Sequence, residues 1–356
     1  MTFLIAAAGT GGHVFPGLAV GEALVDLGVD RSEILYVGGD RMESKVYPAE
    51  GFPFLRVEIR GLQRSMTPKN LGLPMVVARA VRDVRGAIRE RGVRAVLGMG
   101  GYVTLPAAYA ARRAGVPLFV SEQNASAGLA NRIASRWATR AFASFPDTHG
   151  LRGGVWVGNP VRRPFWAFDR DRLRPAALER YGLDASVPVV GVFGGSLGSK
   201  VINDAVVAML SGWSGPEIQV LHLVGDRFAS EHGGDASGPR RVVVRFEDSM
   251  DLFYAACDLV VARSGGGVAE LTATGTPSIL VPGAFGSAGH QEENARFLET
   301  AGAAVVVPES DLGRLGEVVA GLLEEGRLPG MAESARSIGR PRAAHVMAQA
   351  MLEAAR

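Results

Sequence analysis

Three glycine-rich loops are the part of the sequence best suited to chemistry, because each lies between a short apolar run and a stretch with helical periodicity. The loops are Gly9-Thr10-Gly11-Gly12-His13, Gly98-Met99-Gly100-Gly101-Tyr102 and Gly194-Gly195-Ser196-Leu197-Gly198. Where a strand leads into a helix, the first helical N–H groups have no partner and the helix dipole is positive, so a phosphate can approach the glycine backbone. One such loop can merely allow a tight turn, but three in one chain favour an anionic ligand.

The known nucleotide-binding motifs fit these loops badly. A dinucleotide fingerprint, G-x-G-x-x-G, requires glycine where the sequence has Val14 in the first loop region and Phe193 before the third loop. A Walker pattern requires glycine directly before lysine, but Ser199 precedes Lys200. An ATPase is therefore disfavoured, and a dehydrogenase keeps only weak support from Asp40, which could mimic a ribose-binding acid. The sequence predicts no cofactor.

The elements that must position these loops show as an alternation of apolar runs and helical patterns. The predicted strands are FLIAAA, ILYVG, AVLGMG and LFVSE in the first half, and VVGVFG, QVLHLVG, RVVVRF, LVVARS and SILVPG in the second. This alternation indicates an α/β fold with parallel, doubly wound sheets. A segment rich in Pro and Arg near Arg162 separates the two sets. We expect an N-terminal domain at 1–162, a C-terminal domain at 163–340, and a last helix at about 341–356 that docks back on the first domain.

The composition fits a globular protein of about two domains, with 356 residues, 47% hydrophobic and 21% charged. The single cysteine, Cys257, excludes an internal disulfide, and no Cys/His cluster has zinc spacing. The Asp169-Arg170-Asp171 segment resembles a metal-binding D-x-D motif but lies in a charged linker. We therefore assign no metal ion.

The net charge of +2 hides an asymmetry between the two halves. Residues 1–162 hold 20 Lys and Arg against 12 Asp and Glu, whereas the remainder holds 18 against 24. The basic excess is concentrated between Arg60 and Arg94. Such a segment is typical of a site for an anionic partner, which by charge alone is a phospholipid surface, a nucleic acid or a phosphorylated substrate.

Seven motifs occur in order over nearly the whole chain. They are AAGTGGHVFPGLAV, GMGGYVTLPA, EQNASAGLANR, VGNPVR, FGGSLGSKVIN, ARSGGGVAEL and HQEENA. Together they resemble the MurG family of glycosyltransferases. The resemblance implies a GT-B fold, in which two Rossmann-like domains face an interdomain cleft, with the donor UDP-GlcNAc in the C-terminal domain and a lipid-linked acceptor on the N-terminal one. It also implies inverting transfer of GlcNAc to the MurNAc 4-hydroxyl of lipid I, undecaprenyl-pyrophosphoryl-MurNAc-pentapeptide, to give lipid II for peptidoglycan synthesis.

The same resemblance implies a set of substrate-binding residues, and their side-chain types suit that role. The set is Thr10, Gly11, Gly12, Asn124, Arg162, Ser196, Gly266, Gly267, Val268, Ala269, Glu270 and Gln291. Ser196 can donate a hydrogen bond to the diphosphate, and Arg162 can meet the charge that grows on the departing UDP. Glu270 can accept from both ribose hydroxyls, while Asn124 and Gln291 can donate to and accept from sugar hydroxyls.

His13 is the first candidate for the general base that takes the proton from the acceptor hydroxyl. It lies at the mouth of the first helix, which we expect to start near Pro16, and histidine has a pKa near neutrality. As alternatives, His13 could donate a hydrogen bond to a phosphate or serve only as a turn residue. Glu122, at the end of a predicted strand, and Tyr102, in the second loop, are weaker candidates for the base.

Apolar residues lie among the arginines of the basic segment. They are Met66, Leu71, Leu73, Met75, Val76 and Val77. A helix over about residues 70–91 could set an apolar edge against anionic headgroups, although its apolar face could equally pack on its own domain. Because the acceptor of this family carries a polyprenyl tail, we expect an anionic membrane surface, and no nucleic acid, as the partner. The protein would then bind peripherally at the cytoplasmic face of the cell membrane.

Three departures from the family pattern all lie in the donor half. Leu197 stands where the family usually has Gln, the stretch from Gly265 to Glu270 is one residue short and lacks the usual Thr, and Gly289 stands where an acid is common. They leave two alternatives open. One is a GT-B glycosyltransferase with a different nucleotide sugar or lipid acceptor, and the other is a catalytically silent paralogue that only binds ligands.

Overall fold

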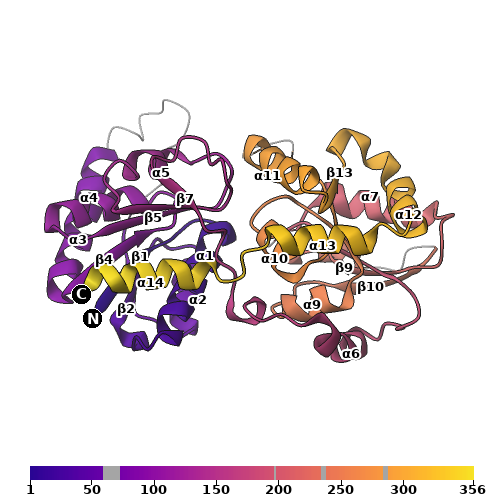
Figure 1. The fold of residues 1–356 in the computed structure, drawn as a ribbon, viewed down its shortest axis with the longest axis horizontal. Coiled ribbons are helices and arrows are strands. Elements are labelled where there is room, and N and C mark those ends of the chain that lie inside the picture. Colours follow the sequence, from indigo (N-terminus) through magenta and orange to yellow (C-terminus); the bar gives the residue numbers. More distant parts are fainter. Residues whose placement is uncertain (59–72, 196–197, 234–237, 284–287) are drawn as a thin grey trace. The chain divides into compact units, whose positions relative to one another are not determined.

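The computed structural model describes residues 1–58, 73–195, 198–233, 238–283 and 288–356 (Figure 1). The chain forms two compact units, Met1–Arg163 together with Arg340–Arg356, and Pro164–Gly339. Each unit has its own parallel sheet with helices packed against it. The α/β class with two parallel sheets, expected from the sequence, is confirmed.

The N-terminal unit contains a seven-stranded sheet in the order β3-β2-β1-β4-β5-β6-β7, and neighbouring strands are parallel. Its strands are β1 (Thr2–Ala6), β2 (Ile34–Gly38), β3 (Phe54–Arg56), β4 (Val93–Gly98), β5 (Leu118–Glu122), β6 (Arg140–Ala143) and β7 (Gly154–Trp156). Its helices are α1 (Gly11–Asp26), α2 (Glu43–Ala49), α3 (Leu73–Glu90), α4 (Thr104–Ala114), α5 (Leu129–Ala134) and α14 (Ala343–Ala355). The last of these, α14, packs against α1 and β4, so both chain ends lie in this unit (Figure 1).

The middle strands of this sheet are buried on both faces, which explains their continuous apolar sequences. β2 and β5 are buried along their whole length, and β1 is partly exposed only at its first residue. The core between the sheet and its helices includes Leu4, Val37, Val96 and Val120. Val84 of α3 belongs to the same core, so one face of this basic helix packs on its own unit.

The C-terminal unit contains a six-stranded parallel sheet in the order β10-β9-β8-β11-β12-β13. Its strands are β8 (Val189–Phe193), β9 (Gln219–Leu223), β10 (Arg240–Val244), β11 (Leu259–Ala262), β12 (Ser278–Leu280) and β13 (Ala304–Val306). Its helices are α6 (Arg170–Tyr181), α7 (Lys200–Ser211), α8 (Ala229–His232), α9 (Met250–Ala256), α10 (Val268–Thr274), α11 (Ala288–Thr300), α12 (Leu315–Glu324) and α13 (Leu328–Ile338). Val190, Val192, Val261 and Ile279 lie in its core.

The nine strands predicted from the sequence are all present, and the differences are local. β3, β6, β7 and β13, each of three or four residues, were not predicted. α1 begins at Gly11 and contains Pro16, whereas the sequence predicted a start near that proline. The helix begins before the proline because the N–H groups of His13 and Val14 both donate to the carbonyl oxygen of Thr10, at 3.0 and 3.1 Å. Of the helix predicted for residues 70–91, the structure describes 73–90 as α3.

Candidate functional site

Each sheet reverses its winding direction at one place, between β1 and β4 in the N-terminal unit and between β8 and β11 in the C-terminal unit. In open parallel sheets, ligands bind beyond the carboxyl ends of the strands at this switch point. The loops after these four strands are residues 7–10, 99–103, 194–199 and 263–267. They contain or adjoin the glycine-rich segments singled out in the sequence, which therefore lie at the ligand-binding edge of each sheet.

The two loops of the N-terminal switch point pack so closely that glycine is required. Gly101 has a φ of +74°, and a Cβ atom there would lie 2.7 Å from the carbonyl oxygen of Ala8. Gly9 has a φ of +107°, and a Cβ atom there would lie 3.6 Å from the ring of Tyr102. A side chain at Gly101 would force the loops apart, whereas at Gly9 the positive φ is what disfavours a side chain.

Thr10, Gly11 and Gly12 form the start of α1. Thr10 is the N-cap residue in an extended conformation, and Gly11 is the first helical residue. N–H groups in a first turn have no acceptor within their helix, so these three residues are disposed to bind an anion. Because α1 has no acidic residue in its first turn, its dipole is not countered there.

The imidazole ring of His13 lies between the two loops of the switch point. Its Nδ1 is 3.4 Å from Oγ1 of Thr10, and a Cβ atom on Gly100 would lie 3.0 Å from its Nε2. Burial lowers the pKa of His13 below the ordinary value of 6.5, although the negative charge of Glu122 opposes this shift. The ring is therefore neutral near pH 7, in the form that can accept a proton.

Glu122 is almost fully buried, and its carboxylate organises the segment that follows β5. Oε1 accepts hydrogen bonds from the backbone N–H and the side-chain amide of Asn124, both at 3.1 Å. Oε2 accepts from the N–H of Gly128 at 3.0 Å and from the amide of Asn131 at 2.8 Å. Four donors thus occupy this carboxylate, which favours an anchoring role for Glu122 over that of a base.

Tyr102 also has a carboxylate partner, which sequence reasoning missed. Its hydroxyl donates to Oε1 of Glu43 at 3.0 Å. Burial and this hydrogen bond raise the pKa of Tyr102, so the phenol keeps its proton and serves as a donor. One signal for Glu43 was available, namely an acid four residues after Gly39, just beyond the carboxyl end of a buried strand.

Arg162 forms ion pairs within its own unit. Its guanidinium lies 3.4 Å from Oε1 of Glu50 and 3.8 Å from Oε1 of Glu22. The neighbouring Arg163 is held in the same way, by its N–H to Glu22 at 3.0 Å and by its guanidinium to Asp26 at 2.7 Å. The acids that hold both arginines lie on α1 and next to α2.

The first loop of the C-terminal switch point runs from Gly194 to Ser199. Ser196 and Leu197, both singled out in the sequence, lie outside the described residues. Ser199 is the N-cap residue of α7, and its Oγ accepts a hydrogen bond of 2.9 Å from Arg263. Because Arg263 directly follows β11, this hydrogen bond joins the two loops of the switch point. Arg263 also pairs with Glu309 at 2.6 Å.

The second loop leads through Gly266 and Gly267 into α10, whose first turn contains Glu270. The hydroxyl of the fully buried Tyr254 donates to Oε2 of Glu270 at 2.9 Å, which orients the carboxylate. Val268 is 4% exposed, so it can offer a ligand little more than its backbone. Ala269 is partly exposed beside it.

Gln291 lies on α11 and connects this helix to the carboxyl ends of two strands. Its Oε1 accepts the N–H of Gly283, after β12, at 2.9 Å. Its backbone oxygen accepts the hydroxyl of Ser264, after β11, at 2.7 Å. Gln291 thus lies at the same edge of the C-terminal sheet as Glu270. In the sequence it follows Gly11, of the other unit, by 280 residues.

A groove of about 730 Å³ lies between α3 and α4 of the N-terminal unit. Its lining combines apolar side chains with four arginines. The lining residues are Val77, Ala78, Val81, Arg82, Arg85, Gly86, Arg89, Leu105, Tyr109, Arg113 and Trp137. Met75, near the start of α3, is 76% exposed. None of the helices in the part of the chain that the structure describes is long and apolar enough to span a bilayer.

Two family models match the chain. The glycosyltransferase family 28 N-terminal domain matches residues 3–143, and the glycosyltransferase family 28 C-terminal domain matches residues 189–346. The two matches fall on the two sheets in the same order.

Curated relatives and solved structures cover nearly the whole chain. A UDP-N-acetylglucosamine--N-acetylmuramyl-(pentapeptide) pyrophosphoryl-undecaprenol N-acetylglucosamine transferase of Halorhodospira halophila is 41% identical over 96% of this chain and 94% of its own length. The enzyme of the same name from Listeria monocytogenes is 36% identical over 99% of both chains. The crystal structure of Acinetobacter baumannii MurG has a TM-score of 0.79 and 26% identity, over 99% of this chain and 100% of that one. UDP-GlcNAc 2-epimerase of Neisseria meningitidis, bound to UDP-GlcNAc, shares the fold at 15% identity with a TM-score of 0.68, over 99% and 100% of the two chains.

Proposed function

The chain belongs to the MurG family within glycosyltransferase family 28, and on this premise we propose how it transfers N-acetylglucosamine from UDP-N-acetylglucosamine to lipid I. It has the GT-B fold of two Rossmann-like domains, and the product of the transfer is lipid II, a peptidoglycan precursor. The observation that carries the proposal is the position of the glycine loops, which follow the strands at the switch point of each sheet.

The C-terminal unit binds the donor in this proposal. The loop from Gly194 to Ser199, with Ser196 as a donor, holds the diphosphate, and Glu270 binds the ribose hydroxyls. Tyr254 supports this role because its hydrogen bond keeps one oxygen of Glu270 in a fixed position. The residues from Gly266 to Ala269 line the same loop, and Gln291 contacts the sugar through its amide.

The N-terminal unit supplies the group that activates the acceptor. The 4-hydroxyl of the muramyl sugar attacks the anomeric carbon of GlcNAc, the bond from that carbon to the UDP oxygen breaks, and the configuration inverts. His13 takes the hydroxyl proton on a ring nitrogen, and UDP leaves with the electron pair. The lowered pKa of His13 supports this assignment, because only the neutral ring can act as the base.

The remaining residues of the N-terminal unit assist in this scheme. Thr10, Gly11 and Gly12 offer their first-turn N–H groups to a phosphate, and Asn124 contacts a sugar hydroxyl. For Arg162 to meet the charge on departing UDP, it must exchange its ion pairs with Glu22 and Glu50 for the ligand.

The direct test supplies purified protein with radiolabelled UDP-N-acetylglucosamine and a lipid I analogue. We expect equal amounts of UDP and labelled lipid II, and we expect excess unlabelled UDP-glucose to compete poorly. Release of UDP without labelled lipid, or equal competition by UDP-glucose, would contradict the proposal. The competition arm addresses the donor-side departures at Gly289 and at the Gly265–Glu270 stretch.

We further propose that the protein binds peripherally to the cytoplasmic face of the cell membrane through the groove between α3 and α4. Arg82, Arg89 and Arg113 line it beside apolar side chains, a combination that suits anionic headgroups and acyl chains. Arg85 adds a buried Nε atom that has no hydrogen-bond partner among the described residues. The polyprenyl tail of lipid I makes such contact necessary.

Vesicle pelleting tests the membrane proposal. Binding to vesicles with anionic phospholipid should weaken as salt rises, and R82E combined with R89E should weaken it further. The matched control is R314E combined with R327E, which changes two exposed arginines of the C-terminal unit. Equal binding to neutral vesicles, or no salt dependence, would contradict the proposal.

A further inference from the structure

Glu43, the first residue of α2, is fully buried, and its carboxylate joins three loops at the carboxyl edge of the N-terminal sheet. Oε1 accepts from the N–H of Gly39 and from the hydroxyl of Tyr102, both at 3.0 Å. Oε2 accepts from the N–H of Gly9 at 3.3 Å. Since these partners follow β2, β4 and β1, one side chain connects the two loops of the switch point with the loop next to them.

Tyr47 lies one turn after Glu43, on the same face of α2. Its hydroxyl donates to the carbonyl oxygen of Val14 in α1 at 3.1 Å. Glu43 and Tyr47 therefore hold the two ends of residues 9–14. This is the segment that contains His13, so a single short helix sets the position of the proposed base.

Two glycines let the side chains of Glu43 and Tyr102 approach the backbone closely. A Cβ atom on Gly39 would lie 2.5 Å from the hydroxyl oxygen of Tyr102, and one on Gly38 would lie 2.6 Å from Cγ of Glu43. In the ranges that the structure describes, no arginine or lysine forms an ion pair with this carboxylate. Its hydrogen bonds go to loop N–H groups and one phenol, so it orients loops instead of balancing a charge.

We propose that Glu43 is a positioning residue for the transfer reaction, which acts through Gly9 and Tyr102 to keep His13 where the acceptor hydroxyl needs it. The inference rests on the proposed function, because it takes His13 as the base. Glu43 itself touches no substrate and moves no proton. A displacement of about 1 Å in a catalytic group can cost on the order of 100-fold in rate, so a small shift of the loop has a measurable effect.

The replacement Glu43→Gln keeps the size of the side chain and tests its three hydrogen bonds. A glutamine offers one oxygen acceptor and an NH2 donor, so Gly9 or Gly39 loses its acceptor and faces a donor. We expect kcat with the lipid I analogue to fall about 10- to 100-fold per folded enzyme. The KM for UDP-N-acetylglucosamine should stay within about twofold, because the donor loops belong to the other unit.

The pH profile of kcat supplies a readout that a loss of folded protein does not move. In the wild-type protein, burial keeps the pKa of His13 below 6.5, so kcat falls only below that pH. When Gly9 loses its acceptor, the loop loosens and the ring of His13 becomes more exposed. Its pKa then rises toward the ordinary value, so the acid limb of the profile should move to higher pH in Glu43→Gln.

Asp258→Asn is the matched control in the C-terminal unit. It also removes the charge of a mostly buried carboxylate, but at the amino edge of its sheet. We expect it to lower stability while kcat per folded enzyme and the acid limb stay unchanged. Glu43→Asp, which keeps the charge but reaches less far, should give a smaller loss of kcat than Glu43→Gln.

The outcomes separate the two proposals. Wild-type kcat and an unmoved acid limb in both Glu43 variants would show that Glu43 serves stability alone. If neither variant folds, Glu43 is a folding residue, and the positioning role is likewise overturned. If the wild-type protein makes no lipid II, the proposed function fails, whatever the variants do.

Discussion

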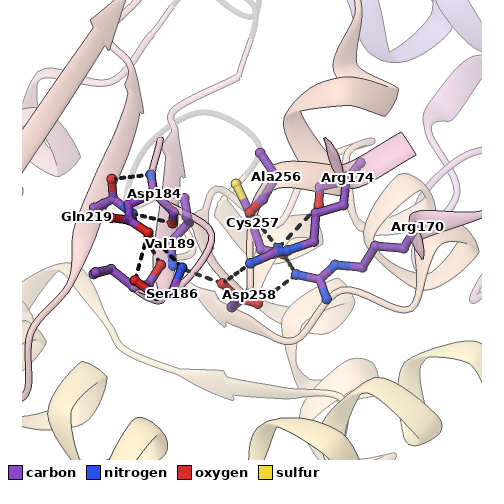
Figure 2. Close-up of polar contacts among 11 residues, drawn as sticks. Arg170, Arg174, Asp184, Ser186, Val189, Gln219, Ala256, Cys257 and Asp258 are labelled. Carbon is purple, nitrogen blue, oxygen red and sulfur yellow. Dashed lines mark hydrogen bonds and ion pairs between the residues drawn. The ribbon is translucent and has the colours of Figure 1, made fainter. Parts of the chain in front are cut away.

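Glu43 and Asp258 each accept several hydrogen bonds that hold neighbouring segments together. Glu43 lies at the carboxyl edge of its sheet, whereas Asp258 lies at the amino edge of the other sheet. Asp258 precedes β11 at the amino edge of the C-terminal sheet, and Figure 2 shows it with Arg170 and Arg174 on one side and Val189 on the other. Its oxygens accept from Arg170 at 2.6 Å, from Arg174 at 3.1 Å and from the N–H of Val189 at 2.9 Å. Glu43, at the carboxyl edge of the N-terminal sheet, has only neutral partners among the described residues.

The hydrogen-bond partners distinguish Asp258, which serves structure, from Glu43, which we propose serves function. The arginines beside Asp258 also donate to the carbonyl oxygens of Ala256 and Cys257, at the end of α9 (Figure 2). That network joins the end of α9 to the starts of β8 and β11, away from the edge where ligands bind. Glu43 instead holds N–H groups of the loops at the ligand-binding edge, where small movements affect chemistry.

The largest effect that the comparison predicts belongs to His13, the group that Glu43 is proposed to position. His13→Ala should lower kcat by about 10²- to 10⁴-fold, the usual contribution of a general base. The loss should be smaller at alkaline pH, where hydroxide can take the proton. The thermal unfolding temperature should change little, and near-full turnover by this variant would refute the assignment.

Asp258→Asn should act on stability alone. Hydrogen bonds to charged groups contribute about 1.5–3 kcal/mol, and this side chain is 23% exposed, so we expect a loss of about 2 kcal/mol. For a unit of this size, that corresponds to a fall of about 4–8 °C in the melting temperature. Calorimetry checks the shift, and a parallel loss of kcat per folded enzyme would break the contrast with Glu43.

Glu270 extends the comparison to the carboxyl edge of the C-terminal sheet. Glu270→Gln should raise the KM for UDP-N-acetylglucosamine about tenfold, because a charge-assisted hydrogen bond to ribose is weakened. The KM for the lipid I analogue should not change. Tyr254→Phe, which removes only the hydroxyl that orients Glu270, should raise the donor KM by less.

The smallest effects come from two buried hydroxyls that both bind carbonyl oxygens of α1. Tyr47 donates to Val14 at 3.1 Å, beside His13, whereas Tyr36 donates to Gly17 at 3.0 Å, one turn further along. Each replacement by Phe should cost about 1 kcal/mol of stability. Only Tyr47→Phe should also lower kcat, by about two- to fivefold, and steady-state kinetics on the two variants tests this difference.

Much of the fold was predictable because the strands of a parallel sheet are continuous apolar runs. LFVSE became β5 with the predicted bounds, and the nine predicted strands all formed. Short edge strands such as β7 escaped prediction because three residues, one of them glycine, do not form a recognisable apolar run. The start of α1 was misjudged because proline is typical of a first turn, whereas Pro16 lies beyond the first turn of this helix.

The candidate residues divide in the same way. Glycines and the first-turn acid Glu270 were visible because their chemistry follows from neighbours in sequence. The pairing of Arg162 with Glu50 joins residues 112 positions apart, and that of Tyr102 with Glu43 joins residues 59 positions apart. No local pattern encodes such partners, so the roles of these side chains could not be assigned from spacing.

The amino-acid sequence alone determined the alternating strands and helices, the glycine loops at strand ends and the family resemblance, since each depends on residues close together along the chain. Tertiary structure alone decided which side chains the loops bind. It placed Glu43 against the loop that precedes His13, paired Asp258 with two arginines, and paired Arg162 with acids of its own unit. The physical reason is that buried carboxylates take their donors from whatever the fold brings within hydrogen-bond distance, and those donors come together only when distant strands pair.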